Sequence, residues 1–419
     1  MPRADVVVIG AGLAGLSCAA ELAERGASVF LAAKGIATTH WTHGGLDVAA
    51  PPGASTHRAG LALLAALDGH PYHALGSDAD AAIDGHLARA AAAGLVHSGG
   101  LDTPLLPIPT AIGSLRPASI LPAAQAAAAE PWGADGLVLV GFGGYRDAWA
   151  AYAARNLAAA GAAWADGPAS IRAVEVDLPG VDGLHNLAAQ NLANRFDNPA
   201  WRDRALDAVA RALPAGKIRI GMPPVLGLDR HAEVLADAER SLGGRIFEIP
   251  SLPPSVPGMR LFEALRRRIL AAGGRIQVGF DVVSVERAAE RVVAVHTEAA
   301  SRTLRLAADA FVLATGGIAG VGFRALPDGT IDERVFGLPV TAPPHDRWFS
   351  DDPLEPHPLE AAGIEVDAEL RPAGLSNVRV IGSALAGMHY LEQRCGDGVA
   401  LASAHRAVRS LAGTKAAAA

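Results

Sequence analysis

The chain contains 419 residues, of which 50% are hydrophobic and 19% are charged. This is enough apolar chain to bury the cores of two or three domains, which excludes global disorder. Its 36 basic and 43 acidic residues give a net charge of −7, which provides no attraction to a polyanion, so we expect no nucleic-acid partner.

The two cysteines, Cys18 and Cys395, limit the possible redox chemistry. They are too few for a disulfide framework, and an iron–sulfur cluster takes about four thiolates. Any redox chemistry must therefore use another cofactor. Apolar runs are broken by Gly, Pro or a charge before they reach the roughly 20 residues that span a bilayer, and glycines interrupt the N-terminal apolar stretch. We expect a cytoplasmic chain that reaches a membrane only through partners.

The first 35 residues predict a strand, a turn, a helix and a second strand. Residues 6–9 form a β-branched run that stops at a glycine, which is typical of a strand buried on both faces. Residues 13–25 then carry apolar side chains at helical spacing, and Gly26 ends this helix. Residues 27–31 predict the second strand.

A dinucleotide fingerprint, Gly10-Ala11-Gly12-Leu13-Ala14-Gly15, lies between this first strand and the helix. The first glycine permits a tight turn, the second allows a pyrophosphate to approach the backbone, and the third lets the helix pack on the strand. The N–H groups at the helix start, at Leu13 and Ala14, then face the phosphates. The alternative is a glycine-rich turn without a ligand.

Further glycines follow later strands and help to identify the ligand. Residues 310–314 predict a buried strand that ends in Thr315-Gly316-Gly317, and residues 378–381 predict another that ends at Gly382. Gly396-Asp397-Gly398 opens a helix that we expect from Val399 to Leu411, and we include Gly396, Asp397, Gly398 and Val399 among the candidate cofactor contacts. Close-approach sites at one sheet edge favour a long, tightly held flavin over an exchangeable nicotinamide.

The acidic residue that usually binds the adenosine ribose is missing. Its place at the end of the second strand is taken by Ala33, followed by Lys34 and Gly35. Alanine accepts no hydrogen bond from a hydroxyl, so the adenosine half is held weakly, held by other groups, or absent. FAD is the flavin that the fingerprint predicts and FMN is the alternative; Lys34 is included among the candidate cofactor contacts.

The strand–turn–helix unit and the glycine-bearing strand ends predict an α/β chain with a Rossmann-like flavin-binding domain, and the alanine-rich stretches that follow predict an inserted α+β cap or substrate domain. We expect the flavin domain to combine residues 1–50, 251–325 and 373–419. An alanine-rich insert would span 51–250, including helices over 80–93 and 146–160, and a second, smaller insertion would span 326–372. Four prolines make residues 248–258 a stiff connector, followed by a helix over 261–272 and strands over 275–278, 282–286 and 292–297.

Over nearly its whole length the sequence resembles the B subunits of anaerobic glycerol-3-phosphate dehydrogenase. The segments that carry the resemblance, besides the fingerprint, are residues 42–47 (THGGLD), 144–147 (GYRD), 176–180 (VDLPG), 247–258 (FEIPSLPPSVPG), 313–317 (LATGG) and 395–400 (CGDGVA). More distantly, the chain looks like the succinate dehydrogenase and fumarate reductase flavoproteins.

This resemblance implies a flavoprotein in a complex with two partners, the catalytic A subunit, which is itself a flavoprotein, and the iron–sulfur C subunit. Such a complex oxidises glycerol 3-phosphate to dihydroxyacetone phosphate and passes electrons to menaquinone. The family's B subunit is usually described as binding FMN, which agrees with the missing acid at Ala33.

The sequence departs from the succinate dehydrogenase pattern at the flavin tether. The tethering histidine would fall on Thr38, with His40 and His43 displaced from that position. We therefore expect a non-covalent flavin, with His43, Gly44 and Gly45 lining the isoalloxazine. No acidic cluster accompanies the histidines, so we expect no metal.

His389 and Arg394 resemble the histidine and arginine that precede the C-terminal glycines of fumarate reductases. In that family the arginine lies near the flavin and binds a carboxylate, and a guanidinium also suits a phosphate. We therefore take both as candidate catalytic residues for a small anionic substrate. The alternative for Arg394 is a structural role at a helix start. Arg260 is a weaker anion-binding candidate, and its alternative is a charge on the helix surface.

The leading hypothesis is a flavin redox subunit that receives a hydride from a C–H bond, here or in a partner, and passes single electrons to partner clusters. A second hypothesis is a subunit that mainly organises the complex and holds flavin weakly or not at all. A third is a free-standing flavin dehydrogenase or reductase of a small anionic substrate.

Overall fold

The computed structural model describes residues 3–181, 183–299 and 302–418, and the chain divides into two compact units. The first comprises Met1–Thr39, Asp47–Ala93 and Phe262–Ala419, and the second comprises His40–Leu46 and Gly94–Leu261. Packing thus places residues 47–93 and 326–372 in the first unit. The domain boundaries expected from the sequence, with an insert over 51–250 and a smaller one over 326–372, stay predictions.

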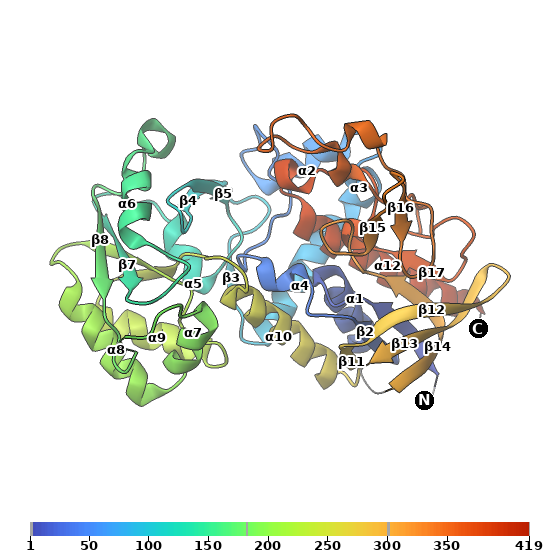
Figure 1. Ribbon diagram of the computed structural model, residues 1–419, viewed down its shortest axis with the longest axis horizontal. Helices are drawn as coiled ribbons and strands as arrows, with labels where there is room; N and C mark the ends of the chain where they lie inside the picture. The colour runs from blue at the N-terminus through green and yellow to red at the C-terminus, as the bar shows by residue number, and fades with distance from the viewer. Residues whose placement is uncertain (1–2, 182, 300–301, 419) are drawn as a thin grey trace. The chain divides into compact units, whose positions relative to one another are not determined.

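The first unit is built on a seven-stranded sheet of order β11-β2-β1-β14-β13-β12, with β17 paired to β14 (Figure 1). The strands β11, β2, β1 and β17 run parallel, and β12 and β13 are antiparallel. Their bounds are β1 (Ala4–Ile9), β2 (Val29–Ala33), β11 (Arg275–Val278), β12 (Asp281–Ala288), β13 (Arg291–Ala299), β14 (Arg302–Leu313) and β17 (Val378–Val380). All seven agree with the strands expected from the sequence, and β14 is longer than expected because its first half pairs with β13.

Helix α1 (Leu13–Glu24) follows β1 as expected and packs against α12 (Gly396–Ala418), which also contacts α4 (Ala79–Ala92). The start of α12 lies three residues before the expected one, since Gly398 stands inside the helix. A Cβ at Gly398 would lie 2.0 Å from Tyr72 Oη, so glycine is required there by packing. The other elements of this unit are α2 (His57–Ala65), α3 (Pro71–Leu75), β15 (Phe323–Ala325), β16 (Ile331–Glu333) and α11 (Tyr390–Gln393).

The second unit contains a four-stranded, wholly parallel sheet of order β10-β9-β7-β8. Val140 and Phe142 face a core shared with α7, α8 and α9, whereas Leu137 and Leu139 face a core shared with α6. The bounds are β7 (Gly136–Phe142), α6 (Ala150–Ala158), β8 (Ile171–Val176), α7 (Ala189–Phe196), α8 (Pro199–Ala212), β9 (Ile218–Met222), α9 (His231–Leu242) and β10 (Arg245–Glu248).

This parallel sheet was not predicted from the sequence. It is accompanied by two antiparallel pairs, β3 (His97–Ser98) with β6 (Leu121–Pro122) and β4 (Leu106–Pro109) with β5 (Leu115–Ala118), and by α5 (Ala123–Ala126).

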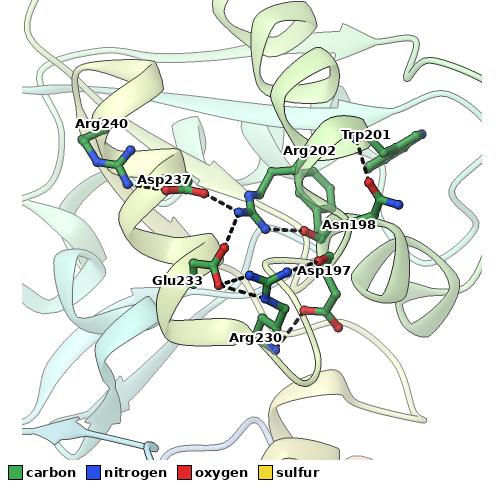
Figure 2. A network of polar contacts seen from close by, with 9 residues as sticks. Asp197, Asn198, Trp201, Arg202, Arg230, Glu233, Asp237 and Arg240 are labelled. Atoms are coloured by element: carbon green, nitrogen blue, oxygen red, sulfur yellow. Dashed lines mark hydrogen bonds and ion pairs between the residues drawn. The ribbon is translucent and has the colours of Figure 1, made fainter.

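A buried arginine joins α8 to α9 (Figure 2). Arg202 is 1% exposed, donates to Glu233 at 2.7 Å and also pairs with Asp237. The carboxylate of Asp197 accepts the backbone N–H groups of residues 228, 229 and 230, at 3.0–3.1 Å, just before α9 begins. A carboxylate before the first turn also complements the positive end of α9. These contacts hold α9 against α8.

Helix α10 (Val256–Ala271) begins inside the proline-rich segment, five residues before the expected start. Pro257 is compatible with this, because a first-turn N–H has no partner within the helix and proline's fixed φ suits the helix. Helix α6, in contrast, is shorter than the expected 146–160. No helix within the described ranges is both long and apolar enough to cross a bilayer.

Candidate functional site

Three strand ends that carry glycines lie side by side in the first unit. Strands β1, β14 and β17 are neighbours and run parallel, with Ile9 opposite Leu313 and Leu313 opposite Val380. Their exits, at Gly10, Thr315-Gly316 and Gly382, therefore meet at one edge of the sheet, as the sequence predicted. Ligands of open α/β sheets bind at this carboxyl edge.

The three fingerprint glycines differ in how much space a side chain would find at each position. Gly10 has φ +113°, and a Cβ there would lie 2.2 Å from the carbonyl oxygen of Ala314; a Cβ at Gly15 would lie 2.1 Å from the carbonyl oxygen of Gly10. Packing alone therefore requires these two glycines. At Gly12 the nearest heavy atom to such a Cβ is Ala37 Cβ, 3.9 Å away. The space beside Gly12 is open to a ligand.

The first turn of α1 faces the same place. Gly12 is its N-cap and supplies no side-chain hydrogen bond, so the N–H groups at Leu13 and Ala14 remain at the positive end of the helix. The open space beside Gly12, next to N–H groups at the positive end of a helix, fits the pyrophosphate of a dinucleotide.

The exits of β14 and β17 supply further polar groups. Thr315 Oγ1 is buried, and within the described ranges it has no hydrogen-bond partner. Gly316 and Gly382 have φ +80° and +70°, which favours glycine. The N–H of Gly382 donates to Ser403 Oγ at 2.9 Å, which links the end of β17 to α12.

At the start of α12, several backbone N–H groups form hydrogen bonds within the chain. The N–H groups of Asp397 and Gly398 donate to the carbonyl oxygen of Asp47, at 3.1 and 3.2 Å, and the N–H of Val399 donates to the carbonyl oxygen of Cys395. A Cβ at Gly396 would find only Tyr390 Cβ, at 3.8 Å. Of the four predicted contacts at this helix start, Gly396 has the open approach, and the others stay predictions.

Lys34 forms an ion pair at the end of β2. Its Nζ lies 2.9 Å from Asp281 Oδ2. The sequence analysis did not single out Asp281, although the strand at residues 275–278 and the turn after it could have placed this acid at the same sheet edge as Ala33.

His43, Gly44 and Gly45 belong to the second unit, where local packing explains the glycines. The N–H of Gly45 donates to His43 Nδ1 at 3.1 Å, and Gln125 Nε2 donates to the carbonyl oxygen of His43 at 2.6 Å. A Cβ at Gly44 would lie 2.6 Å from Pro257 Cβ. Their contact with an isoalloxazine stays a prediction.

His389 and Arg394 stand on either side of α11, in the first unit. Arg394 adopts a left-handed backbone conformation with φ 45° and ends the helix. The N–H of His389 donates to Gln393 Oε1 at 2.9 Å. His389 Nδ1 is buried, and it has no hydrogen-bond partner in the part of the chain that the structure describes. The catalytic role of both residues stays a prediction.

A second histidine, His70, which the sequence analysis did not identify, contacts the last residue of α11. His70 is 3% exposed, its Nδ1 accepts the N–H of Tyr72 at 3.1 Å, and its Nε2 lies 3.2 Å from Gln393 Oε1. Because Nδ1 accepts, Nε2 carries the proton and donates to Gln393. Burial lowers the pKa of His70 to about 4, so the ring is neutral near pH 7.

Gln393 Oε1 also receives the thiol of Cys395, whose Sγ lies 3.7 Å away. One carboxamide oxygen thus accepts three donors, and Gln393 itself is 8% exposed. Burial raises the pKa of the thiols of Cys395 and Cys18, so both stay protonated near pH 7.

The structure shows that the interpretation of Arg260 as an anion-binding residue is wrong. Its guanidinium is buried, bonds Glu248 Oε2 at 2.6 Å and donates to the carbonyl oxygen of Gly227. A side chain paired in this way has a structural role. Among the described residues no group of three or more His, Cys, Asp and Glu side chains is placed to hold a metal ion.

The chain matches the model of the FAD-binding domain family over residues 5–399. It is 33% identical to a probable B subunit of anaerobic glycerol-3-phosphate dehydrogenase from Halobacterium salinarum, over 97% of both chains. It is 31% identical to the B subunit of anaerobic glycerol-3-phosphate dehydrogenase from Yersinia pestis, over 96% of both chains. The chain belongs to this family of B subunits.

Membership confirms the resemblance seen in the sequence and the expected α/β flavin-binding fold. The expectation of a flavin is also confirmed, with FAD as the main assignment. The open surface at Gly12 and the free hydroxyl of Thr315 fit such a ligand. Among solved structures, a 3-ketosteroid Δ1-dehydrogenase from Sterolibacterium denitrificans matches 99% of this chain and 100% of its own, at 11% identity and a TM-score of 0.45.

Proposed function

We propose that this chain is the flavin-binding redox subunit of a quinone-linked glycerol-3-phosphate dehydrogenase. The observation that carries the proposal is the alignment of Gly12, Thr315-Gly316 and Gly382 at one sheet edge, in a chain related to glycerol-3-phosphate dehydrogenase B subunits. Glycerol 3-phosphate would lose two electrons and two protons to become dihydroxyacetone phosphate. A bound flavin supplies the acceptor for the hydride.

The chain's own residues would bind and orient the two molecules. The loop from Gly10 to Gly15 would hold the pyrophosphate through backbone N–H groups. Arg394 would bind the substrate phosphate, which a guanidinium can do with two parallel hydrogen bonds. His389 Nδ1, buried and without a partner in the described ranges, would accept the hydroxyl proton.

Electrons would leave through partner proteins. The chain has two cysteines, both buried thiols with raised pKa values, so it offers no set of thiolates for a cluster. We therefore propose two partners, the catalytic A subunit, which is a flavoprotein, and the iron–sulfur C subunit, with menaquinone as the final acceptor. The complex would place this cytoplasmic chain at the inner face of the membrane.

Two measurements test this function. First, the purified chain is denatured and the released flavin is identified by chromatography; we expect FAD at close to one per chain. Second, the chain co-expressed with its two partner subunits is assayed for reduction of a quinone by glycerol 3-phosphate. A chain alone that reduces quinone at the full rate would contradict the need for partners, and a complex inactive on glycerol 3-phosphate would contradict the substrate.

A subunit that mainly organises the complex is the second candidate. It is favoured by Ala33 and by the use of the Asp397 and Gly398 N–H groups inside the protein. This candidate predicts a colourless chain that stays colourless after incubation with FAD or FMN, yet is still required for the assembly of its partners.

A further inference from the structure

The first residue of β12, Asp281, lies beside the end of β2. We propose that Asp281, held by Lys34, takes the place of the missing acid at Ala33 and binds the adenosine ribose of FAD. The inference rests on the proposed flavin site and adds the residue that selects FAD over FMN.

Backbone contacts bring Asp281 to the correct strand end. Strands β2 and β11 run parallel, with Ala33 opposite Val278, so both end at the same sheet edge (Figure 1). The carbonyl oxygen of Ala33 accepts the N–H groups of Gly279 and Phe280, at 2.8 and 2.9 Å. The turn that starts β12 is therefore bound directly to the last residue of β2, and Asp281 is the next residue.

The side chains confirm that the two segments are close. Lys34, the residue after Ala33, reaches Asp281 Oδ2 at 2.9 Å, and Arg334 lies 3.9 Å from the same oxygen. The side chain of Asp281 is 34% exposed. Its carboxylate is therefore held by two cations and still accessible to ribose hydroxyls.

The carboxylate of Asp281 suits a group that FAD has and FMN lacks, the ribose of the adenosine. In dinucleotide folds an acid at the end of the second strand accepts hydrogen bonds from the ribose hydroxyls of the adenosine. FMN lacks this adenosine, so an acid here would discriminate between the two flavins. The sequence count placed the acid at residue 33, whereas β11 brings Asp281 to the end of the same strand from a segment about 250 residues away.

If Asp281 had only a structural role, its replacement would not change flavin binding selectively. An exposed Lys–Asp pair contributes little to stability, because solvent screens it. Replacing Asp281 should therefore leave the fold intact and change only the binding of a ligand that reaches it.

The test is a calorimetric titration of the flavin-free full chain with FAD and, separately, with FMN. For Asp281→Asn we expect about a tenfold loss of FAD affinity, the size of one charge-assisted hydrogen bond, and no change for FMN. Lys34→Met should weaken FAD in the same direction. The matched control is Asp309→Asn, which removes an exposed carboxylate paired with Arg3 near the start of β1, at the opposite sheet edge.

The outcomes separate this inference from the proposed function. If wild type binds FAD and Asp281→Asn binds it equally well, the inference is overturned and the flavin site stands. An equal loss for FAD and FMN, or a lower melting temperature in Asp281→Asn than in the control, would also overturn it. If wild type binds neither flavin, the proposed function fails and the inference fails with it.

Discussion

Asp47 and Asp397, 350 positions apart in the chain, are joined by reciprocal hydrogen bonds at the start of α12. The N–H of Asp47 donates to Asp397 Oδ2 at 2.9 Å, and the N–H of Asp397 donates to the carbonyl oxygen of Asp47 at 3.1 Å. The same carbonyl accepts the N–H of Gly398. The segment around Asp47 thus caps the C-terminal helix through contacts within the chain.

The two glycines of this helix start should respond differently to alanine. A Cβ at Gly398 would lie 2.0 Å from Tyr72 Oη and 2.6 Å from the carbonyl oxygen of Val48, so Gly398→Ala should lower the free energy of unfolding by about 2 kcal/mol or more. Gly396→Ala meets no close atom and should unfold like wild type but lose flavin. Urea unfolding and flavin content measure the two effects; equal stabilities would contradict the packing role of Gly398.

The fingerprint offers a matched pair of the same kind. Gly12→Ala keeps an ordinary φ of −73° and meets no atom nearer than 3.9 Å, so the fold should survive while the methyl group blocks the pyrophosphate. Gly10→Ala would place its Cβ 2.2 Å from a carbonyl oxygen and should misfold. Circular dichroism and bound flavin are the readouts. If Gly12→Ala retained full flavin, the open surface beside Gly12 would not be the binding site.

The sequence predicted the elements of the flavin unit because their signals are local. Strand β1 is a β-branched run that ends in glycine, and α1 follows at helical spacing. The common edge of the glycine-bearing strand ends of β1, β14 and β17 was also predicted, because ligands of α/β sheets bind at the carboxyl ends of the strands. The parallel sheet of the second unit was missed, because its alanine-rich helices masked the short strands between them.

Contacts between distant segments could not be predicted. His70, Gln393 and Cys395 meet only after the chain folds, and no spacing indicates that one amide oxygen serves all of them. Arg260 was misjudged for the same reason, since its partner Glu248 is 12 residues away across a proline-rich segment. Single residues gained their roles from tertiary partners that one sequence does not reveal.

Gln393 should hold the segment 389–394, which contains α11, in place. Gln393→Leu would leave the N–H of His389, the Nε2–H of His70 and the thiol of Cys395 without an acceptor, at a cost of about 3 kcal/mol in the free energy of unfolding. Gln393→Glu keeps the acceptor and should unfold at a urea concentration near that of wild type. If the leucine variant matched the glutamate variant, the three hydrogen bonds would contribute nothing.

The pH dependence of stability should contain a contribution from His70. Its folded pKa of about 4 lies below the unfolded value of 6.5, so between these values the unfolded chain binds a proton that the folded chain does not. Stability should therefore rise with pH through this window and fall by about 3 kcal/mol on acidification from pH 6.5 to 4.

His70→Asn should remove that slope, and His185→Asn, at an exposed site, should keep it. Urea unfolding at several pH values gives the slopes; one common slope would contradict the burial of a neutral ring.

Arg394 provides the sharpest test of the substrate assignment. If its guanidinium binds the substrate phosphate, Arg394→Ala should lower kcat/KM for glycerol 3-phosphate in the assembled complex by 100-fold or more, about 3 kcal/mol, while FAD stays bound. Arg394→Lys keeps the charge but loses the paired donors, so its kcat/KM should lie between those of wild type and Arg394→Ala. Added guanidinium should partly restore the activity of the alanine variant. Arg324→Ala, at an exposed ion pair with Asp332, is the control.

The backbone at this position requires one more variant. Arg394 has φ 45°, where asparagine is better tolerated than alanine, so Arg394→Asn separates the loss of charge from backbone strain. If the asparagine variant turned over glycerol 3-phosphate at the wild-type rate, Arg394 would be a helix-ending residue and the phosphate would bind elsewhere. If both variants lost activity and flavin together, the residue would support the cofactor and not the substrate.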